Sequence, residues 1–282
     1  MNRPPPQLVD SLDDPRVAPY RNLKDRELAR LGNRFIAEGE LVVRRLLDSD
    51  YSTESVFLAM RRVAEIAPIV PPHVPVYAAP QEIVNGVLGY RFHSGVMAVG
   101  LRKPPVHILD LASHWPKQAT LVVCPNTNNT ENLGAMIRIA AGFGASVLLL
   151  GPESCDPFYR QSVRVSMGSA FRLPIAQSAD LLTDLQTLRD RHGVQLIATA
   201  LGDDSQPLAL TRRADRVALL FGNEAQGLPQ DIVNICEQRV MIPMSLGTDS
   251  LNVAISAGIV LYHYTQVVGA TASPGASADR HR

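Results

Sequence analysis

The sequence predicts an α/β protein of two domains, the second of which is built on a parallel β-sheet covered by helices. The chain has 282 residues, and 46% of them are hydrophobic, which is enough to fill two cores of ordinary size. After residue 118, short apolar runs alternate with longer runs of helical periodicity, as expected for a parallel sheet flanked by helices. Three prolines between residues 104 and 118 break any regular pattern and mark a linker.

Five segments follow from these patterns. Residues 1–15 and 269–282 are rich in Pro, Gly, Ser and Ala. We expect both to be mobile tails, because they cannot bury enough apolar surface to offset the entropy lost on ordering. Residues 16–103 form a small α/β domain, residues 104–118 the linker and residues 119–268 the second domain.

Periodicity and turn-forming residues predict the elements of each domain. In the small domain, β-rich runs cover 55–59, 74–78 and 95–100, and helical runs cover 41–47, 61–66 and 80–87. In the second domain, strands are expected over 120–124, 146–150, 194–200, 217–221 and 239–242, and helices over 133–142, 157–165, 179–191, 229–236 and 251–267.

Charge and cysteine content exclude several classes of protein. The 27 basic and 27 acidic residues cancel, so a nucleic-acid surface has to be local. Three cysteines without ligand spacing and seven scattered histidines argue against a disulfide framework or a bound metal. No signal peptide and no run of about 18 apolar residues is present, which predicts a cytoplasmic protein that does not enter a membrane.

A local basic surplus lies near the start of the small domain. Between residues 16 and 34 there are six basic and two acidic residues. One interpretation is an RNA-facing surface, and the other is a solvated helix face with internal ion pairs, which is common and contributes little. The RNA-facing candidates are Arg16, Arg21, Lys24 and Arg26.

Three stretches of the second domain carry polar groups where a strand gives way to a helix. Asn132 and Arg138 follow the first strand, Glu224 lies in a turn bracketed by glycines, and Ser250 and Asn252 open an almost wholly apolar helix. The asparagines and the serine are suited to helix caps, Arg138 to a surface ion pair and the glycines to an ordinary strand-to-helix turn. Local chemistry alone leaves these interpretations open.

Together, the three stretches resemble a known family. The motif Asn132-x-Gly-x-x-x-Arg138, the turn Gly222-Asn-Glu, and Ile-Pro-Met followed by Ser-Leu-Asn-Val resemble, in this order, the SpoU/TrmH family of RNA ribose 2'-O-methyltransferases in the SPOUT superfamily. The resemblance implies a C-terminal SPOUT domain with a trefoil knot, a substrate-binding N-terminal domain similar to ribosomal protein L30e, and S-adenosylmethionine as the methyl donor without a metal.

The resemblance also assigns roles to particular residues. Arg138 would act either as the general base or as a phosphate clamp that stabilises the alkoxide, because an arginine with a pKa above about 12 is a poor base. The predicted catalytic set is Arg138, Asn132, Glu224, Ser250 and Asn252. Cofactor contacts, mostly through backbone groups, are expected at Ala200, Gly222, Ile242 and Leu251. Arg160 and Arg164, at i, i+4 spacing, would add a second phosphate-binding stripe.

The sequence therefore predicts an S-adenosylmethionine-dependent enzyme that methylates a ribose 2'-hydroxyl of rRNA or tRNA. Two alternatives are an inactive RNA-binding module of the same fold and a SPOUT enzyme that methylates a base, which the Ser-Leu-Asn signature disfavours. Because the helix over 251–267 is apolar around most of its circumference, we also predict a homodimer through the second domain, with an RNA site drawn from both subunits. Burial of this helix within its own domain is the alternative.

Overall fold

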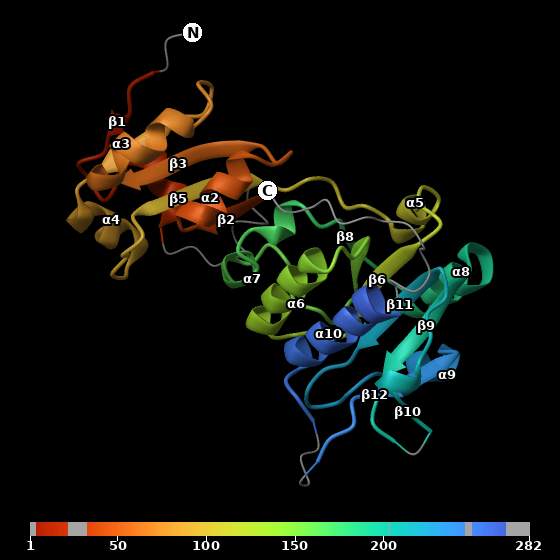
Figure 1. Cartoon of the computed structure of the whole chain (residues 1–282). Helices are drawn as coiled ribbons and strands as arrows, with labels where there is room; N and C mark the ends of the chain where they lie inside the picture. Colours follow the sequence, from red (N-terminus) through yellow and green to blue (C-terminus); the bar gives the residue numbers. More distant parts are fainter. Residues whose placement is uncertain (1–3, 22–32, 203, 246–249, 269–282) are drawn as a thin grey trace. The chain divides into compact units, whose positions relative to one another are not determined.

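The computed structural model describes residues 4–21, 33–202, 204–245 and 250–268 (Figure 1). Its contacts divide the chain into two compact units. Unit 1 consists of the residues up to Pro104 together with Asp156–Arg172, and unit 2 consists of Pro105–Cys155 and the residues from Leu173 onward. The insertion Asp156–Arg172, which was expected in the second domain, belongs to unit 1.

Unit 2 contains a seven-stranded sheet in which every neighbouring pair of strands is parallel, as predicted. Its strand order is β10-β12-β9-β11-β6-β7-β8. The strands are β6 (Ala119–Cys124), β7 (Val147–Leu150), β8 (Ile175–Gln177), β9 (Val194–Thr199), β10 (Gln206–Pro207), β11 (Arg216–Phe221) and β12 (Gln238–Met241). The sequence did not predict β8 and β10, because two or three residues are too few for a periodicity to show.

Helices cover both faces of this sheet (Figure 1). The helices of unit 2 are α5 (Ile108–Ala112), α6 (Thr130–Gly142), α8 (Leu181–His192), α9 (Gln230–Ile235) and α10 (Val253–Tyr262). Side chains of α5, α8 and α9 share one core with alternate residues of the central strands. On the other face, α6 packs against α10. The central strands are buried on both sides as a result, which explains why they read as continuous apolar runs.

Several element boundaries of unit 2 differ from the prediction, and α6 begins at Thr130 instead of residue 133. The expected linker 104–118 contains α5, whose residue Ile108 is fully buried. The last helix begins at Val253 instead of residue 251, because Asn252 is its N-cap, and beyond Tyr262 it continues as a π-helix over His263–Val267. Among the described residues, no helix is long and apolar enough to cross a membrane.

Unit 1 is a five-stranded mixed sheet with helices packed on it. The strand order is β1-β4-β3-β5-β2, with β5 antiparallel to both of its neighbours. The strands are β1 (Gln7–Leu8), β2 (Arg34–Glu38), β3 (Thr53–Ala59), β4 (Val76–Ala79) and β5 (Val96–Leu101). The helices are α2 (Glu40–Leu47), α3 (Val63–Ile66), α4 (Gln81–Leu88) and, from the insertion, α7 (Arg160–Val165).

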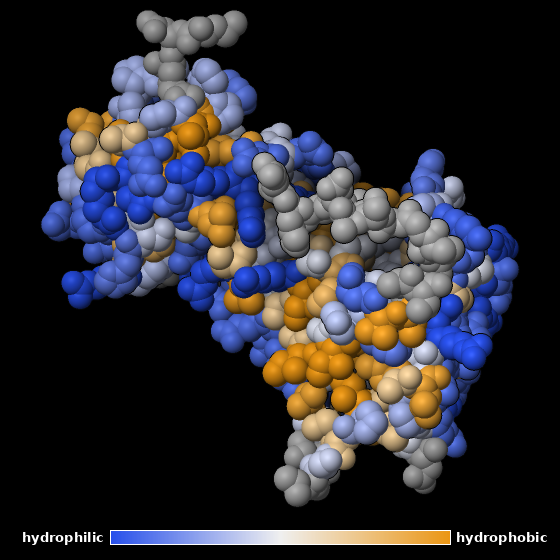
Figure 2. Space-filling view, viewed as in Figure 1, coloured by the Kyte–Doolittle hydropathy of each residue, from blue (hydrophilic) through white to orange (hydrophobic). Residues whose placement is uncertain are grey.

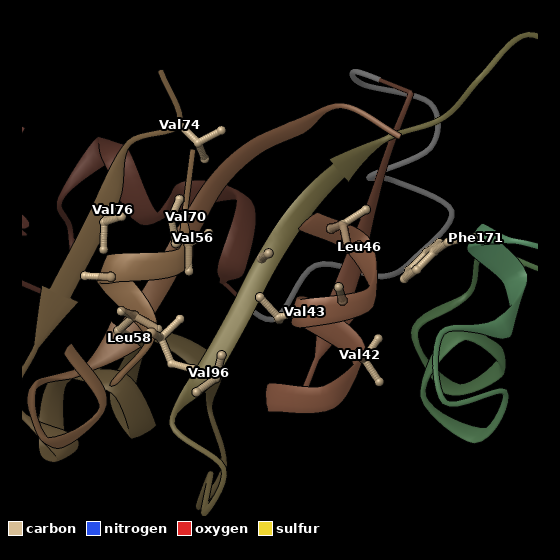
Figure 3. Close-up of a cluster of buried hydrophobic side chains, with 14 of the residues drawn as sticks. Val42, Val43, Leu46, Val56, Leu58, Val70, Val74, Val76, Val96 and Phe171 are labelled. Carbon is tan, nitrogen blue, oxygen red and sulfur yellow. The ribbon is translucent and has the colours of Figure 1, made fainter. Parts of the chain in front are cut away.

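The insertion belongs to unit 1 because its aromatic side chains fill that core. Phe171 packs against the buried face of α2 (Figure 3). Its ring centroid lies 5.4 Å from that of Phe35, and the Phe158 ring lies 5.2 Å from the same partner. A helix over 157–165 was expected, and α7 starts three residues later, after a turn in which the Phe158 N–H donates to Asp156 Oδ1.

The prediction of a mobile tail over residues 1–15 is wrong for the part that the structure describes. Strand β1 pairs in parallel with β4, and Val9 is only 1% exposed, with its N–H donating to the Ala78 carbonyl at 2.9 Å. Pairing to a distant strand supplies the burial that the local composition lacks. Residues 269–282, the other expected tail, lie outside the described residues.

Candidate functional site

A cavity of about 700 Å³ opens in unit 2 where β9, β11 and β12 end. The carboxyl ends of parallel strands are where open α/β sheets bind ligands. All four residues predicted to hold a cofactor line this cavity, and apolar side chains of the sheet and of α10 form part of its wall. The four are Ala200, Gly222, Ile242 and Leu251.

A tight loop borders the cavity after β11. Asn223 and Gly227 exchange backbone hydrogen bonds, 3.1 Å and 2.8 Å long. A Cβ at Gly222 would lie 2.3 Å from the Gly227 backbone carbon, and Gly227 has φ +70°, so both positions require glycine. We call residues 222–228 the glutamate loop, because Glu224 lies exposed within it and lines the cavity.

Three polar side chains from separate segments meet at this loop. The Asn252 Nδ2 group donates to Asn132 Oδ1 at 3.0 Å and to Glu224 Oε1 at 2.8 Å. The Asn252 Oδ1 accepts from the backbone N–H groups of Ala254 and Ile255, so the same side chain also caps α10. We call Asn132, Glu224 and Asn252 the amide cluster. Asn252 is therefore the cap of α10, and it also meets two of the other predicted catalytic residues, while its part in catalysis stays a prediction.

Comparison with known proteins identifies the family. The model of the SpoU rRNA Methylase family matches residues 119–262. An uncharacterised tRNA/rRNA methyltransferase of Mycobacterium bovis is 37% identical over 268 residues, which cover 92% of each chain. The protein belongs to the SpoU methylase family.

Two further relatives connect the SpoU methylase fold to named proteins. The AdoMet-bound rRNA methyltransferase of Sinorhizobium meliloti superposes with a TM-score of 0.77 at 29% identity, covering 91% of this chain and 96% of that one. The 23S rRNA (guanosine-2'-O-)-methyltransferase RlmB of Acinetobacter baylyi is 28% identical over 205 residues, covering 72% of this chain and 82% of its own.

In this SpoU methylase, Asn132 is not a helix cap. The cap of α6 is Asn129, whose Oδ1 accepts from the N–H groups of Glu131 and Asn132 at 2.8 and 3.1 Å. The Asn132 side chain is thereby free to enter the amide cluster. Within the described residues, the Asn132 Nδ2 and the second oxygen of Glu224 have no hydrogen-bond partner.

The two other predicted catalytic residues lie apart from the amide cluster. Ser250 lines the cavity without contributing a hydrogen bond to the described part of the chain. Arg138 is exposed on α6, about 9 Å along the helix and about 120° around it from Asn132. No ion pair or hydrogen bond joins Arg138 to another described residue.

The predicted RNA-facing residues that are described all lie in unit 1, and several serve its own structure. Arg16 bonds Asp14, the Leu8 carbonyl and Gln7, and the hydrogen bonds from its side chain and its backbone N–H to Asp14 hold the pKa of that carboxyl below its usual value. Arg21 donates to the Asp14 carbonyl at 2.8 Å. Lys24 and Arg26 lie outside the described residues.

Arg160 and Arg164 share one face of α7, as the spacing predicted. Both approach the carboxylate of Glu38, at 3.7 and 4.0 Å, and the Arg160 guanidinium lies 5.4 Å from the centre of the Tyr90 ring. The side chains are 42% and 51% exposed, so a phosphate can reach them. Contact of either residue with RNA stays a prediction.

Sequence analysis missed several polar groups of the cavity wall. Asp204 and Ser205 follow β9, and Arg239 on β12 approaches Asp204 at 3.3 Å. Their position near strand ends was the available signal. In the described part of the chain, no cluster of three or more His, Cys, Asp and Glu side chains could hold a metal ion. None of the three cysteines, all of which the structure describes, forms a disulfide, and burial raises the pKa of Cys124 to about 12.

Proposed function

We propose that the protein transfers a methyl group from S-adenosylmethionine to a ribose 2'-hydroxyl of structured RNA, either rRNA or tRNA. The observation that carries the proposal is the amide cluster at the rim of the cavity. In this cluster, the Asn252 side chain hydrogen-bonds to both Asn132 and Glu224, which come from two other segments of the chain. The 2'-O specificity named for the Acinetobacter relative supports the choice of a ribose hydroxyl over a base.

The cavity suits an adenosine cofactor. Its volume is within the range of small-molecule sites, and its lining combines apolar side chains with the Gly222 backbone and a few polar groups. Ala200, Gly222, Ile242 and Leu251 would hold the cofactor, which supplies a methyl group already activated for displacement when it is bound. The protein then has to orient the ribose hydroxyl and remove its proton.

The hydrogen bonds of the amide cluster divide these tasks. Asn252 has both N–H groups and its oxygen engaged, so it orients its neighbours instead of contacting RNA. Asn132 keeps its Nδ2 group for a phosphate or ribose oxygen of the substrate. Glu224 keeps one carboxylate oxygen, which can accept a hydrogen bond from a ribose hydroxyl.

We also propose that the site is shared by two subunits of a homodimer. Ile255, Ile259 and Tyr262 of α10 are 55%, 39% and 55% exposed. Figure 2 shows an apolar patch where α10 lies in Figure 1. An apolar surface of this kind is typical of an interface, and a two-fold axis brings the same helix of both chains together. Arg138 lies on α6, which packs on α10, and can then complete the site of the other subunit as base or clamp.

The remaining expectations from the sequence and the resemblance accompany this proposal. They are the trefoil knot of unit 2, an L30e-like character of unit 1 with RNA contacts from its arginines, and a cytoplasmic location. RNA binding by unit 1 would supply substrate affinity through phosphate contacts, leaving the chemistry to unit 2.

Alkaline cleavage of total RNA from cells with and without the gene tests the proposal, because a 2'-O-methyl group protects the linkage that follows it. We expect at least one rRNA or tRNA position to lose protection in the deletion strain and to regain it with the wild-type gene. An identical cleavage pattern in both strains contradicts the proposal, and RNA binding without any protected position would instead favour the inactive RNA-binding module.

A further inference from the structure

The glutamate loop is tied to the end of β6 by a buried asparagine. The Oδ1 of Asn126 accepts from the Asn223 N–H at 3.1 Å, and the Asn126 backbone carbonyl accepts from Asn223 Nδ2 at 3.2 Å. The Asn126 Nδ2 points to the Gly227 carbonyl, at 3.5 Å. One side chain therefore contacts both ends of the loop that carries Glu224.

Asn126 is held firmly by its own surroundings. A Cβ at Gly151 would lie 2.2 Å from the carbonyl oxygen of Pro125, so the end of β7 packs directly against the residue before Asn126. On the other side, the Thr127 N–H donates to Ser154 Oγ and the Thr127 carbonyl accepts from the Cys155 N–H. The asparagine thus projects from a segment whose backbone is fixed on both sides.

The loop itself has few other constraints. Across its base run the two backbone bonds between Asn223 and Gly227, and inside it the Asn223 Oδ1 accepts from the Ala225 N–H at 2.7 Å. Glu224, between these residues, is exposed. The place of Glu224 against Asn252 therefore depends on how the base of the loop is held. Among the described residues, Asn126 is the side chain from outside the loop that hydrogen-bonds to this base.

We infer that Asn126 is a positioning residue for methyl transfer: by tying the glutamate loop to the end of β6, it keeps the Glu224 carboxylate against the Asn252 amide. Asn126 is only 6% exposed, so it acts through the loop without touching RNA. The inference rests on the proposed function for its kinetic effect, and on the hydrogen bonds alone for its effect on the loop.

A double-mutant cycle tests the inference. The assay uses labelled S-adenosylmethionine and total RNA from cells that lack the gene. We expect Asn126→Ala to lower kcat by about 10- to 100-fold, the usual cost of a small misplacement of a reacting group. In a Glu224→Ala background the same substitution should change kcat by less than about twofold, because the group it positions is absent. Equal factors in both backgrounds, or a fully active Asn126→Ala protein, overturn the inference.

Hydrogen–deuterium exchange gives a readout that does not need activity. Asn126→Ala should speed exchange in the peptide 222–228, whereas Ser178→Ala should not. Ser178 is a matched control because it is 5% exposed and its Oγ donates one hydrogen bond, to Asp184, outside the site. Unchanged exchange in 222–228 contradicts the inference.

If Asn126→Ala does not fold, Asn223→Ala takes its place, since it removes the Nδ2 bond from the other side. It should show the same dependence on Glu224, and independence would again overturn the inference. A wild-type protein that binds no S-adenosylmethionine and methylates no RNA would refute the proposed function, and the exchange comparison would still decide the tie to the loop.

Discussion

The two units use their polar side chains in different ways. In unit 1, charged groups pair with one another near the surface: Glu40 accepts from Arg44 and from Arg62, and these bonds lower the pKa of the carboxyl. In unit 2, two amides and one carboxylate from segments more than 25 residues apart meet at the rim of a cavity. Ion pairs at the surface contribute little to stability. The amide cluster retains free hydrogen-bonding groups, which points to a ligand.

The largest expected effect is on the unfolding free energy, and it compares one core substitution in each unit. Phe171→Ala should cost unit 1 about 3–5 kcal/mol of unfolding free energy, because the ring is buried beside α2. Leu185→Ala, in the core of unit 2, should cost that unit about 2–5 kcal/mol. Hydrogen exchange measured unit by unit distinguishes them. If Phe171→Ala loosened the strands of unit 2 and left unit 1 unchanged, the assignment of the insertion would be wrong.

Arg138→Ala tests whether the exposed arginine belongs to the chemistry. We expect the rate of methyl transfer to fall by about 100- to 1,000-fold, the usual loss when one charge-stabilising group is removed. The affinity for S-adenosylmethionine should change by less than about twofold, since Arg138 does not line the cavity. Calorimetry and transfer assays are compared on the same preparation. A parallel loss of cofactor binding would contradict the assigned role.

Asn252→Asp tests the amide cluster with almost no change in volume. The new carboxylate still caps α10 but cannot donate to Glu224, whose carboxylate oxygen lies 2.8 Å from the replaced nitrogen. Loss of the donor and repulsion between the charges should lower kcat by about 100-fold. Asn234→Asp on α9 is the control, because that exposed asparagine contacts Gln230 and does not line the cavity. Similar kcat values for both variants would show that the amide cluster has no role in methyl transfer.

A smaller effect is expected at the exposed face of α10. Ile259→Glu and Tyr262→Glu place a charge on the apolar surface and should raise the dimer dissociation constant by at least about tenfold, as loss of a central contact does. Sedimentation equilibrium of the full chain gives the constant. A wild-type protein that stays monomeric at micromolar concentration would contradict the dimer and with it a shared site.

The smallest expected effect concerns a buried tyrosine of unit 1. The Tyr20 hydroxyl lies 2.8 Å from Ser55 Oγ, and burial raises the pKa of Tyr20 above its ordinary value of 10. The native state therefore keeps a proton that the unfolded chain loses above pH 10, so this group's contribution to stability declines as the pH rises beyond 10.

Tyr20→Phe isolates that contribution. It should cost about 1 kcal/mol at pH 7, for one buried hydrogen bond. Above pH 10 the variant should lose stability less steeply than the wild type, by up to about 1.4 kcal/mol per pH unit. Urea unfolding at pH 7, 10 and 11 measures both effects, and equal slopes for the two proteins would refute the assignment to Tyr20.

The local sequence predicted where the elements lie better than it predicted which other elements they pack or pair with. Apolar runs located β6, β7, β9, β11 and β12 within one residue at each end, because strands buried on both faces leave a continuous signal, whereas β8 and β10 were missed. The insertion was misassigned, since nothing in the periodicity of 157–165 tells which core its aromatic side chains enter. The pairing of β1 was missed for the same reason: it depends on a strand about 70 residues away.

The candidate site shows the same limit. The resemblance singled out Asn132, Glu224 and Asn252, and the structure brings these three together. The direction of their hydrogen bonds could not be predicted, because it depends on Asn129 capping α6 in place of Asn132 and on the single Asn252 amide serving two partners. Nor did the sequence indicate that Arg138 lies apart from the amide cluster.

The most direct test of the central claim is the chemical position of the transferred methyl group. The purified protein is incubated with methyl-labelled S-adenosylmethionine and total RNA from cells lacking the gene, and the RNA is digested to nucleosides for mass spectrometry. The proposal predicts the label in a 2'-O-methylnucleoside with the wild-type protein and about 100-fold less of it with Asn252→Asp. Label found on a base, or no label in any nucleoside, would contradict it.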